Sequence, residues 1–160
     1  SLIPNREYSF VRVGSLPQAT WYTDFSKSGG PLFDLAIHDL DLILWLEKSL
    51  VSSLSPSKID MIYNCSMTLV NGTRVHINSG WVDEKNVFQN NIKLIGTEPI
   101  TVELLSKSRY PEAYESQINA FIATLSGQSN QLATLEDGFA AIELAERISR
   151  LAEMKKFMIP

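Results

Sequence analysis

GGPLFDLAIHDLD, residues 29–41, carries the strongest fold signal in this chain. Its two glycines permit a sharp backbone turn, and Pro31 suits the first position of a helix, where its missing amide proton is no loss. The apolar residues that follow are spaced as on a helix, so the sequence predicts a helix from about Pro31 to Leu46. Apolar side chains cover most of its circumference, which indicates that this helix packs into the core.

Three ionisable side chains lie on one side of this apolar helix. At about 100° per residue, Asp34, His38 and Asp41 fall within roughly 60° of one another. Burying a carboxylate without a partner costs several kcal/mol, so the stripe is either paired internally or faces a cleft open to substrate. Histidine exchanges protons near neutral pH, and Asp34 one turn earlier can orient it, which suits acid–base chemistry on a hydroxyl. A metal site on the three side chains is the disfavoured alternative, because such ligands usually come from more than one element.

The composition bounds the class of protein. The chain has 160 residues, 44% of them hydrophobic, and a net charge of −4, which predicts one domain with a real core. It has no run of lysines or arginines, so we expect neither nucleic acid nor membranes as partners. The absence of a long apolar run and of a signal-peptide pattern predicts a cytoplasmic protein. The single cysteine, Cys65, cannot form an internal disulfide and is expected to be a reduced thiol.

Alternating residues predict a sheet after the first helix. The expected strands are residues 8–13, 59–70, 73–82, 87–95 and 100–105, with a type I′ turn at Asn71-Gly72. Two helices follow, one over residues 111–125 and one from the capping sequence at 134–137 to about Met154. This pattern predicts the α+β class, with an open, mostly antiparallel sheet arranged as a meander and helices packed on one face.

One face of the predicted sheet is apolar and the other is polar. Within residues 73–82, Val75, Ile77 and Trp81 point to one side. The opposite side is either solvated or covered by a partner. Its polar residues are Arg74, His76, Asn78, Gln89, Asn91 and Lys93.

Together these segments resemble the C-terminal domain of the Gfo/Idh/MocA oxidoreductases, the family of glucose-fructose oxidoreductase and inositol dehydrogenase. The resemblance covers nearly the whole chain and keeps the family's order. It rests on Trp21–Asp24, the spacing GG-x3-D-x3-H-x2-D over residues 29–41, Asn71–Thr73, Ile95–Glu98, Tyr114–Ile122 and Thr134–Gly138.

The resemblance implies a two-domain enzyme that moves a hydride between NAD or NADP and a sugar, inositol or related polyol. His38 would then transfer the proton, and Asp34 would contact or position the reacting hydroxyl. Trp21 and Asp24 are further candidates for the substrate cleft, and Asp41 would support the helix. Because family members commonly pair through the open sheet, a homo-oligomer through the polar face is expected.

The chain lacks two sequence motifs that the family uses for cofactor binding and catalysis. None of its eight glycines forms the G-x-G-x-x-G pattern, and the family's Glu-Lys-Pro motif is absent. Residues 1–160 are therefore expected to form one substrate-binding and dimerisation domain without the Rossmann domain, with no cofactor of its own and no activity in isolation. The alternative is a non-catalytic ligand-binding or assembly module of the same fold.

Overall fold

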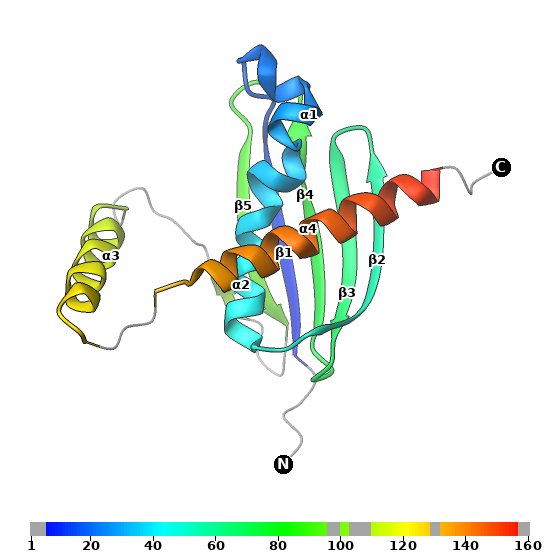
Figure 1. Ribbon diagram of the computed structural model, residues 1–160. Helices are drawn as coiled ribbons and strands as arrows, with labels where there is room; N and C mark the ends of the chain where they lie inside the picture. The colour runs from blue at the N-terminus through cyan, green and yellow to red at the C-terminus, as the bar shows by residue number, and fades with distance from the viewer. Residues whose placement is uncertain (1–5, 96–99, 103–109, 129–131, 157–160) are drawn as a thin grey trace.

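Six strands form one sheet, and helices cover one of its faces (Figure 1). The computed structural model describes residues 6–95, 100–102, 110–128 and 132–156. The strand order is β2-β3-β4-β1-β5-β6, and every neighbouring pair is antiparallel except β1 with β4. The predicted α+β class, with an open, mostly antiparallel sheet and helices on one face, is confirmed.

The first strand lies in the middle of the sheet, not at its edge. Phe10 of β1 is opposite Ile77 of β4 on one side and Ile92 of β5 on the other. The expected simple meander is therefore wrong, because β1 lies parallel to β4 and not beside the strand that follows it in the chain. A parallel pair needs a long connection between its strands, which here is residues 16–73. The strands are β1 Glu7–Ser15, β2 Val51–Ile59, β3 Ile62–Leu69, β4 Arg74–Val82, β5 Phe88–Ile95 and β6 Ile100–Val102.

The strand expected over residues 59–70 is in fact the second half of a hairpin. β2 precedes it, and Pro56 of β2 pairs with Cys65 of β3. The sequence of β2 is rich in serine and contains a proline, both of which weaken a strand pattern. Proline is tolerated here because β2 is an edge strand.

The turn between β3 and β4 is not the predicted type I′ turn. Gly72 has a φ of 87°, but Asn71 is not among the residues with positive φ, which type I′ also requires. Leu69 and Thr73 close a three-residue loop: the Leu69 N–H donates to the Thr73 carbonyl at 2.8 Å, and the Gly72 N–H donates to the Leu69 carbonyl at 2.9 Å. The Asn71 side chain accepts the Thr73 N–H at 3.0 Å, so asparagine acts through its side chain and not through a left-handed backbone.

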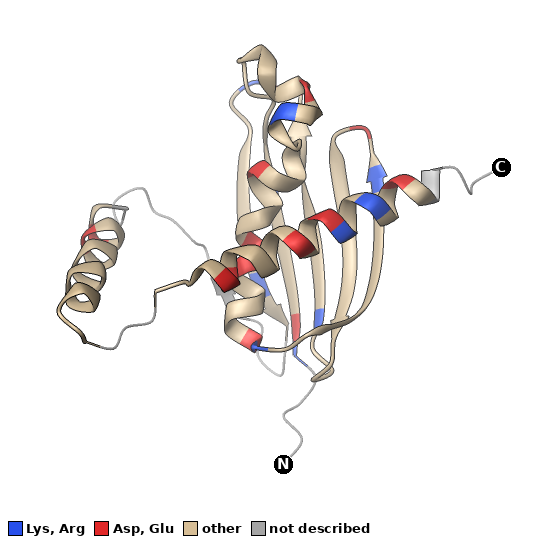
Figure 2. Ribbon diagram, viewed as in Figure 1, with Lys and Arg blue, Asp and Glu red and all other residues tan. Residues whose placement is uncertain are grey.

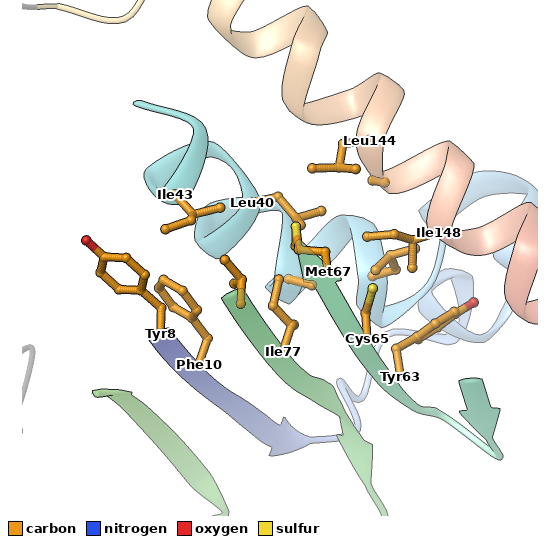
Figure 3. Close-up of a cluster of buried hydrophobic side chains, with 14 of the residues drawn as sticks. Tyr8, Phe10, Leu40, Ile43, Tyr63, Cys65, Met67, Ile77, Leu144 and Ile148 are labelled. Atoms are coloured by element: carbon orange, nitrogen blue, oxygen red, sulfur yellow. The ribbon is translucent and has the colours of Figure 1, made fainter. Parts of the chain in front are cut away.

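Two long helices cross the same face of the sheet and enclose the core (Figure 3). The predicted helix from Pro31 is confirmed as a π-helical turn, η2, followed by α2. Leu40 and Ile43 of α2 meet Val75 and Ile77 of the sheet in one buried cluster, which also confirms the apolar face predicted for residues 73–82. The helical segments are η1 Thr20–Thr23, α1 Phe25–Ser28, η2 Leu32–Ala36, α2 Ile37–Glu47, α3 Tyr110–Leu125 and α4 Leu135–Lys156.

The last helix is amphipathic and begins with the predicted capping sequence. The Thr134 hydroxyl accepts the Asp137 N–H at 3.2 Å, and the Asp137 carboxylate accepts the Thr134 N–H at 2.7 Å. Charged residues recur along α4 (Figure 2), and Glu143, Glu146, Arg147, Arg150 and Glu153 among them are exposed. Its buried residues are Ala141, Leu144, Ala145, Ile148 and Ala152.

Helix α3 stands apart from these layers in Figure 1, and its apolar residues Ile118, Phe121 and Leu125 are exposed. The break predicted at 96–99 and the last expected strand residues, 103–105, lie outside the described residues, and of the stretch Ile95–Glu98 only Ile95, the last residue of β5, is described. Within the described parts of the chain, no helix combines the length and apolar character needed to cross a membrane.

Candidate functional site

A short helix leads the chain toward the glycine corner. Asp24 caps this helix, α1: its Oδ1 accepts the Ser26 N–H at 3.2 Å and the Ser26 hydroxyl at 2.6 Å. Its Oδ2 lies 2.9 Å from Lys27 Nζ. The Ser26 hydrogen bond, followed by the contact with Lys27, lowers the pKa of Asp24 below its ordinary value. The structure therefore gives Asp24 a capping role, and its contact with a substrate stays a prediction.

The glycine corner is held by hydrogen bonds and requires glycine. Gly29 has a φ of 69°, and a Cβ atom there would lie 2.8 Å from the Phe33 ring. The Ser28 hydroxyl accepts the Gly30 N–H at 2.9 Å and donates to the Tyr22 carbonyl at 2.7 Å. The direction in which the following helix leaves the corner is thus fixed.

The helix begins with a π-helical turn. In η2, the Ile37 N–H reaches back five residues to the Leu32 carbonyl, so this turn holds one residue more than an α-helical turn. Asp34 lies inside it, and His38 lies just after it in α2. The angle of 100° per residue, from which Asp34, His38 and Asp41 were predicted to share one side of the helix, therefore does not hold across this turn. Single π-helical turns frequently occur at functional sites.

The Asp34 side chain is half-buried and bound to a tryptophan from the sheet. The Trp81 indole Nε1 donates a hydrogen bond to Asp34 Oδ2 at 3.1 Å. Trp81 is only 3% exposed, and its ring meets Tyr22 edge-on at 5.6 Å between centroids. Trp21, an expected cleft residue, stacks on Tyr22 at 3.9 Å and is 47% exposed. The structure thus places Asp34 against an aromatic cluster, Trp21, Tyr22, Phe25 and Trp81.

The other two members of the predicted stripe have different surroundings. His38 is exposed, and within the described residues its imidazole makes no hydrogen bond or ion pair. Asp41 is half-buried and lines a separate hollow with Trp45, Lys48 and Asp137. Over the described ranges, no three His, Cys, Asp or Glu side chains are arranged to hold a metal ion.

Two residues of this region were missed by the sequence pattern. Asp39 is 1% exposed and pairs with Arg12 of β1, and Trp81 was expected only as a core residue. The polar atom of a buried indole needs a partner, and so does a carboxylate placed among apolar helix positions. From the sequence alone, one can therefore expect that Trp81 and Asp39 each have a polar partner, but not which residue that partner is.

The polar face of the sheet pairs its own side chains across strands. Arg74 and His76 of β4 both contact Glu7 of β1, and the His76 Nδ1 lies 3.0 Å from the Ser66 hydroxyl. The hydrogen bond from Arg74 lowers the pKa of Glu7 below its ordinary value. The face is therefore an ordered polar network, opposite to the face that carries Trp81.

A protein-family model matches most of the part of the chain that carries the candidate site. A model described as the GFO/IDH/MocA C-terminal domain matches residues 6–101. That range spans the glycine corner, η2, α2 and the first five strands. No curated protein matches the chain.

Several solved structures share the fold. Scyllo-inositol dehydrogenase from Lactobacillus casei, solved with NAD(H) and scyllo-inositol, matches with a TM-score of 0.75 and 17% identity, covering 96% of this chain and 56% of that one. UDP-N-acetylglucosamine 3-dehydrogenase from Acidithiobacillus ferrooxidans matches with a TM-score of 0.73 and 16% identity, covering 94% and 54%. Myo-inositol 2-dehydrogenase from Lactobacillus plantarum matches with a TM-score of 0.72 and 16% identity, covering 93% and 55%. This chain thus spans little more than half the length of each of these three structures.

Proposed function

Because the chain belongs to the GFO/IDH/MocA C-terminal domain family, we propose that it is the substrate-binding domain of an NAD(P)-dependent dehydrogenase. The proposed substrate is a sugar, an inositol or a related polyol. The fold-related proteins support this class, since their names describe dehydrogenases of inositols and of a nucleotide sugar.

One observation carries the proposal: a carboxylate and an imidazole on neighbouring turns of an anchored helix. Asp34 lies in η2 with one oxygen already bound to Trp81, and His38 follows in α2 with its ring exposed. The Arg12–Asp39 pair beside His38 ties α2 to the sheet. A rigid support of this kind is what oriented acid–base groups require.

The two side chains can divide the work on a hydroxyl group. When the hydroxyl is oxidised, His38 accepts its proton, and in the reverse direction His38 returns a proton to the oxygen. Asp34 accepts a hydrogen bond from the same or a neighbouring hydroxyl and orients it. Polyols present several hydroxyls in a fixed arrangement, so a pair of polar groups on one helix can select among them.

The residues of this chain do not fit a dinucleotide site. A Rossmann site needs a glycine-rich turn between a strand and a helix of a parallel sheet. The eight glycines lack that spacing, and β1 and β4 are the one parallel pair among the described strands. We therefore propose that NAD or NADP, which takes up the hydride, is held by a part of the protein outside this chain, and that the chain alone is inactive.

We further propose that two copies of the chain pair through the polar sheet face. The helices α2 and α4 lie on the opposite face, so this one is free of them (Figure 1). Its polar groups include Arg74, His76, Asn78, Gln89, Asn91 and Lys93. Sedimentation of the purified chain tests the proposal, and a monomer at all concentrations contradicts it.

The catalytic proposal is tested in the full-length dehydrogenase. Reduction of NAD and NADP is followed with a panel of sugars and inositols, in the unchanged protein and in His38→Ala and Asp34→Asn. Loss of a positioned acid–base group lowers kcat by about 10²–10⁴-fold. The control is Asp60→Asn, a change of the same kind at an exposed turn between β2 and β3.

Two results contradict the proposal. If both variants keep the full kcat, Asp34 and His38 do not have these roles. If the folded full-length protein reduces neither cofactor with any of these substrates but binds one of them, the alternative of a non-catalytic binding module takes its place.

A further inference from the structure

The hydrogen bond between Trp81 and Asp34 joins the sheet to the helix that carries the candidate site. Trp81 comes from β4, 47 residues after Asp34 in the chain, and its indole Nε1 lies 3.1 Å from Asp34 Oδ2. The chain contains three tryptophans, and the other two are much more exposed: Trp21 is 47% exposed and Trp45 is 41% exposed, against 3% for Trp81.

The indole ring is held firmly enough to act as a fixed donor. Tyr22 meets it edge-on at 5.6 Å with an interplanar angle of 84°, and Phe25 meets it at 6.4 Å with an angle of 67°. Both aromatic rings come from the segment just before the glycine corner. The same segment therefore shapes the turn that carries Asp34 and packs the donor that binds it.

The chemistry of an indole N–H dictates what it does to a carboxylate. Indole can only donate, so Asp34 Oδ2 must accept, and the torsions that orient the carboxylate are restrained. One oxygen is then occupied, and Oδ1 is left to accept a hydrogen bond from a ligand. A carboxylate without this restraint would rotate, and its oxygens would exchange places.

We propose that Trp81 is a positioning residue for Asp34. Its indole N–H holds Oδ2 of the carboxylate, so that Oδ1 faces the substrate hydroxyl in a single orientation. This inference deepens the proposed function and rests on it for the catalytic consequence. The contact itself does not depend on that function.

The catalytic consequence is tested with Trp81→Phe in the full-length dehydrogenase. Phenylalanine keeps an aromatic ring against Tyr22 and Phe25 but has no donor. A misplaced catalytic group costs up to about 10²-fold, so we expect kcat to fall by about 10- to 100-fold. Trp45→Phe is the matched control, because Trp45 lies at the far end of α2 and contacts a different hollow, and we expect its kcat to be unchanged.

A double-mutant cycle separates positioning from a general loss of structure. If Trp81 acts through Asp34, Trp81→Phe lowers kcat in the unchanged protein and has no further effect in an Asp34→Ala variant, which has no side-chain oxygen to accept the indole N–H. If Trp81→Phe lowers kcat by the same factor in both backgrounds, the inference is wrong.

An NMR measurement on the 160-residue chain tests the contact without any activity. The three indole N–H signals are assigned with Trp→Phe variants, and Asp34→Ala is expected to shift the Trp81 signal and to leave the Trp45 signal in place. An unmoved Trp81 signal overturns the inference even if the protein is an active dehydrogenase. A shifted signal in a protein without dehydrogenase activity supports the contact and rejects only the proposed function.

Discussion

Arg12 and Asp39 form a two-point ion pair between the central strand and the long helix. The Arg12 Nε lies 3.0 Å from Asp39 Oδ2, and Nη2 lies 2.6 Å from Oδ1. The side chain of Asp39 is 1% exposed and that of Arg12 is 14% exposed. Asp39 follows His38 directly, so the pair fixes the backbone from which the exposed imidazole projects.

Removing Arg12 should be one of the most damaging single changes in the chain. Arg12→Met leaves the Asp39 carboxylate buried without a partner, which costs about 3–5 kcal/mol. Urea unfolding measures the loss in the free energy of unfolding. In the double variant Arg12→Met with Asp39→Leu, most of this stability should return, because no charge remains buried.

Arg74→Met serves as the control for this change. Arg74 also pairs with a carboxylate across two strands, but its side chain is 54% exposed, so solvent replaces the lost contact. We expect only a small change in the unfolding free energy. If Arg74→Met and Arg12→Met lower the unfolding free energy equally, the burial of the Arg12–Asp39 pair does not account for its contribution to stability.

Glu47 should anchor the other end of the long helix. Its side chain is 3% exposed, and it accepts hydrogen bonds from the Tyr8 hydroxyl at 2.7 Å, the Asn71 amide at 2.9 Å and the Thr73 hydroxyl at 3.0 Å. Glu47→Ala leaves these donors without their acceptor, at a cost of about 1–3 kcal/mol. Thermal or urea unfolding measures the cost, and an unchanged stability contradicts the anchoring role.

The same residue predicts a pH dependence. Burial alone would raise the pKa of Glu47, but the hydrogen bonds from Tyr8, Asn71 and Thr73 outweigh it and hold the pKa below its ordinary value. Ionised Glu47 therefore contributes its full stabilisation of the folded chain at pH values above the pKa of an unfolded glutamate, about 4.3. This contribution is lost as the pH falls from there through the lower pKa that Glu47 has in the folded state. The stability difference between the unchanged chain and Glu47→Gln should narrow over this range. A difference that stays constant with pH argues against the assignment.

Two glycine-to-alanine changes should have opposite signs. Gly29 has a positive φ and Phe33 stands where a Cβ would go, so Gly29→Ala should destabilise the chain by at least about 1–2 kcal/mol. Gly138 lies in α4, and nothing lies within 4 Å of a Cβ placed there, so Gly138→Ala should stabilise it by about 0.5–1 kcal/mol. Melting temperatures of the two variants decide the question, and a shift in the same direction for both would contradict the backbone explanation.

The pattern-based predictions held where a residue's neighbours in the chain decide its state. The helix from Pro31, the two faces of β4 and the capping sequence at Thr134 all depend on spacings of two to four residues. The prediction failed for β2, whose serines and Pro56 resemble a loop, because its strand structure comes from pairing with β3 at the edge of the sheet. The place of β1 between β4 and β5 was equally unreadable, since pairing partners lie far away in the sequence.

For the candidate site, periodicity placed Asp34 and His38 on one apolar helix and predicted acid–base chemistry for them, and that chemistry stays a prediction. Periodicity could not identify their supports. The Trp81 hydrogen bond and the Arg12–Asp39 pair join residues 47 and 27 positions apart, and the π-helical turn alters the angle between Asp34 and His38. Local spacing reports which side of an element a residue occupies, whereas the partner of a buried polar atom is chosen only when distant strands and helices pack together.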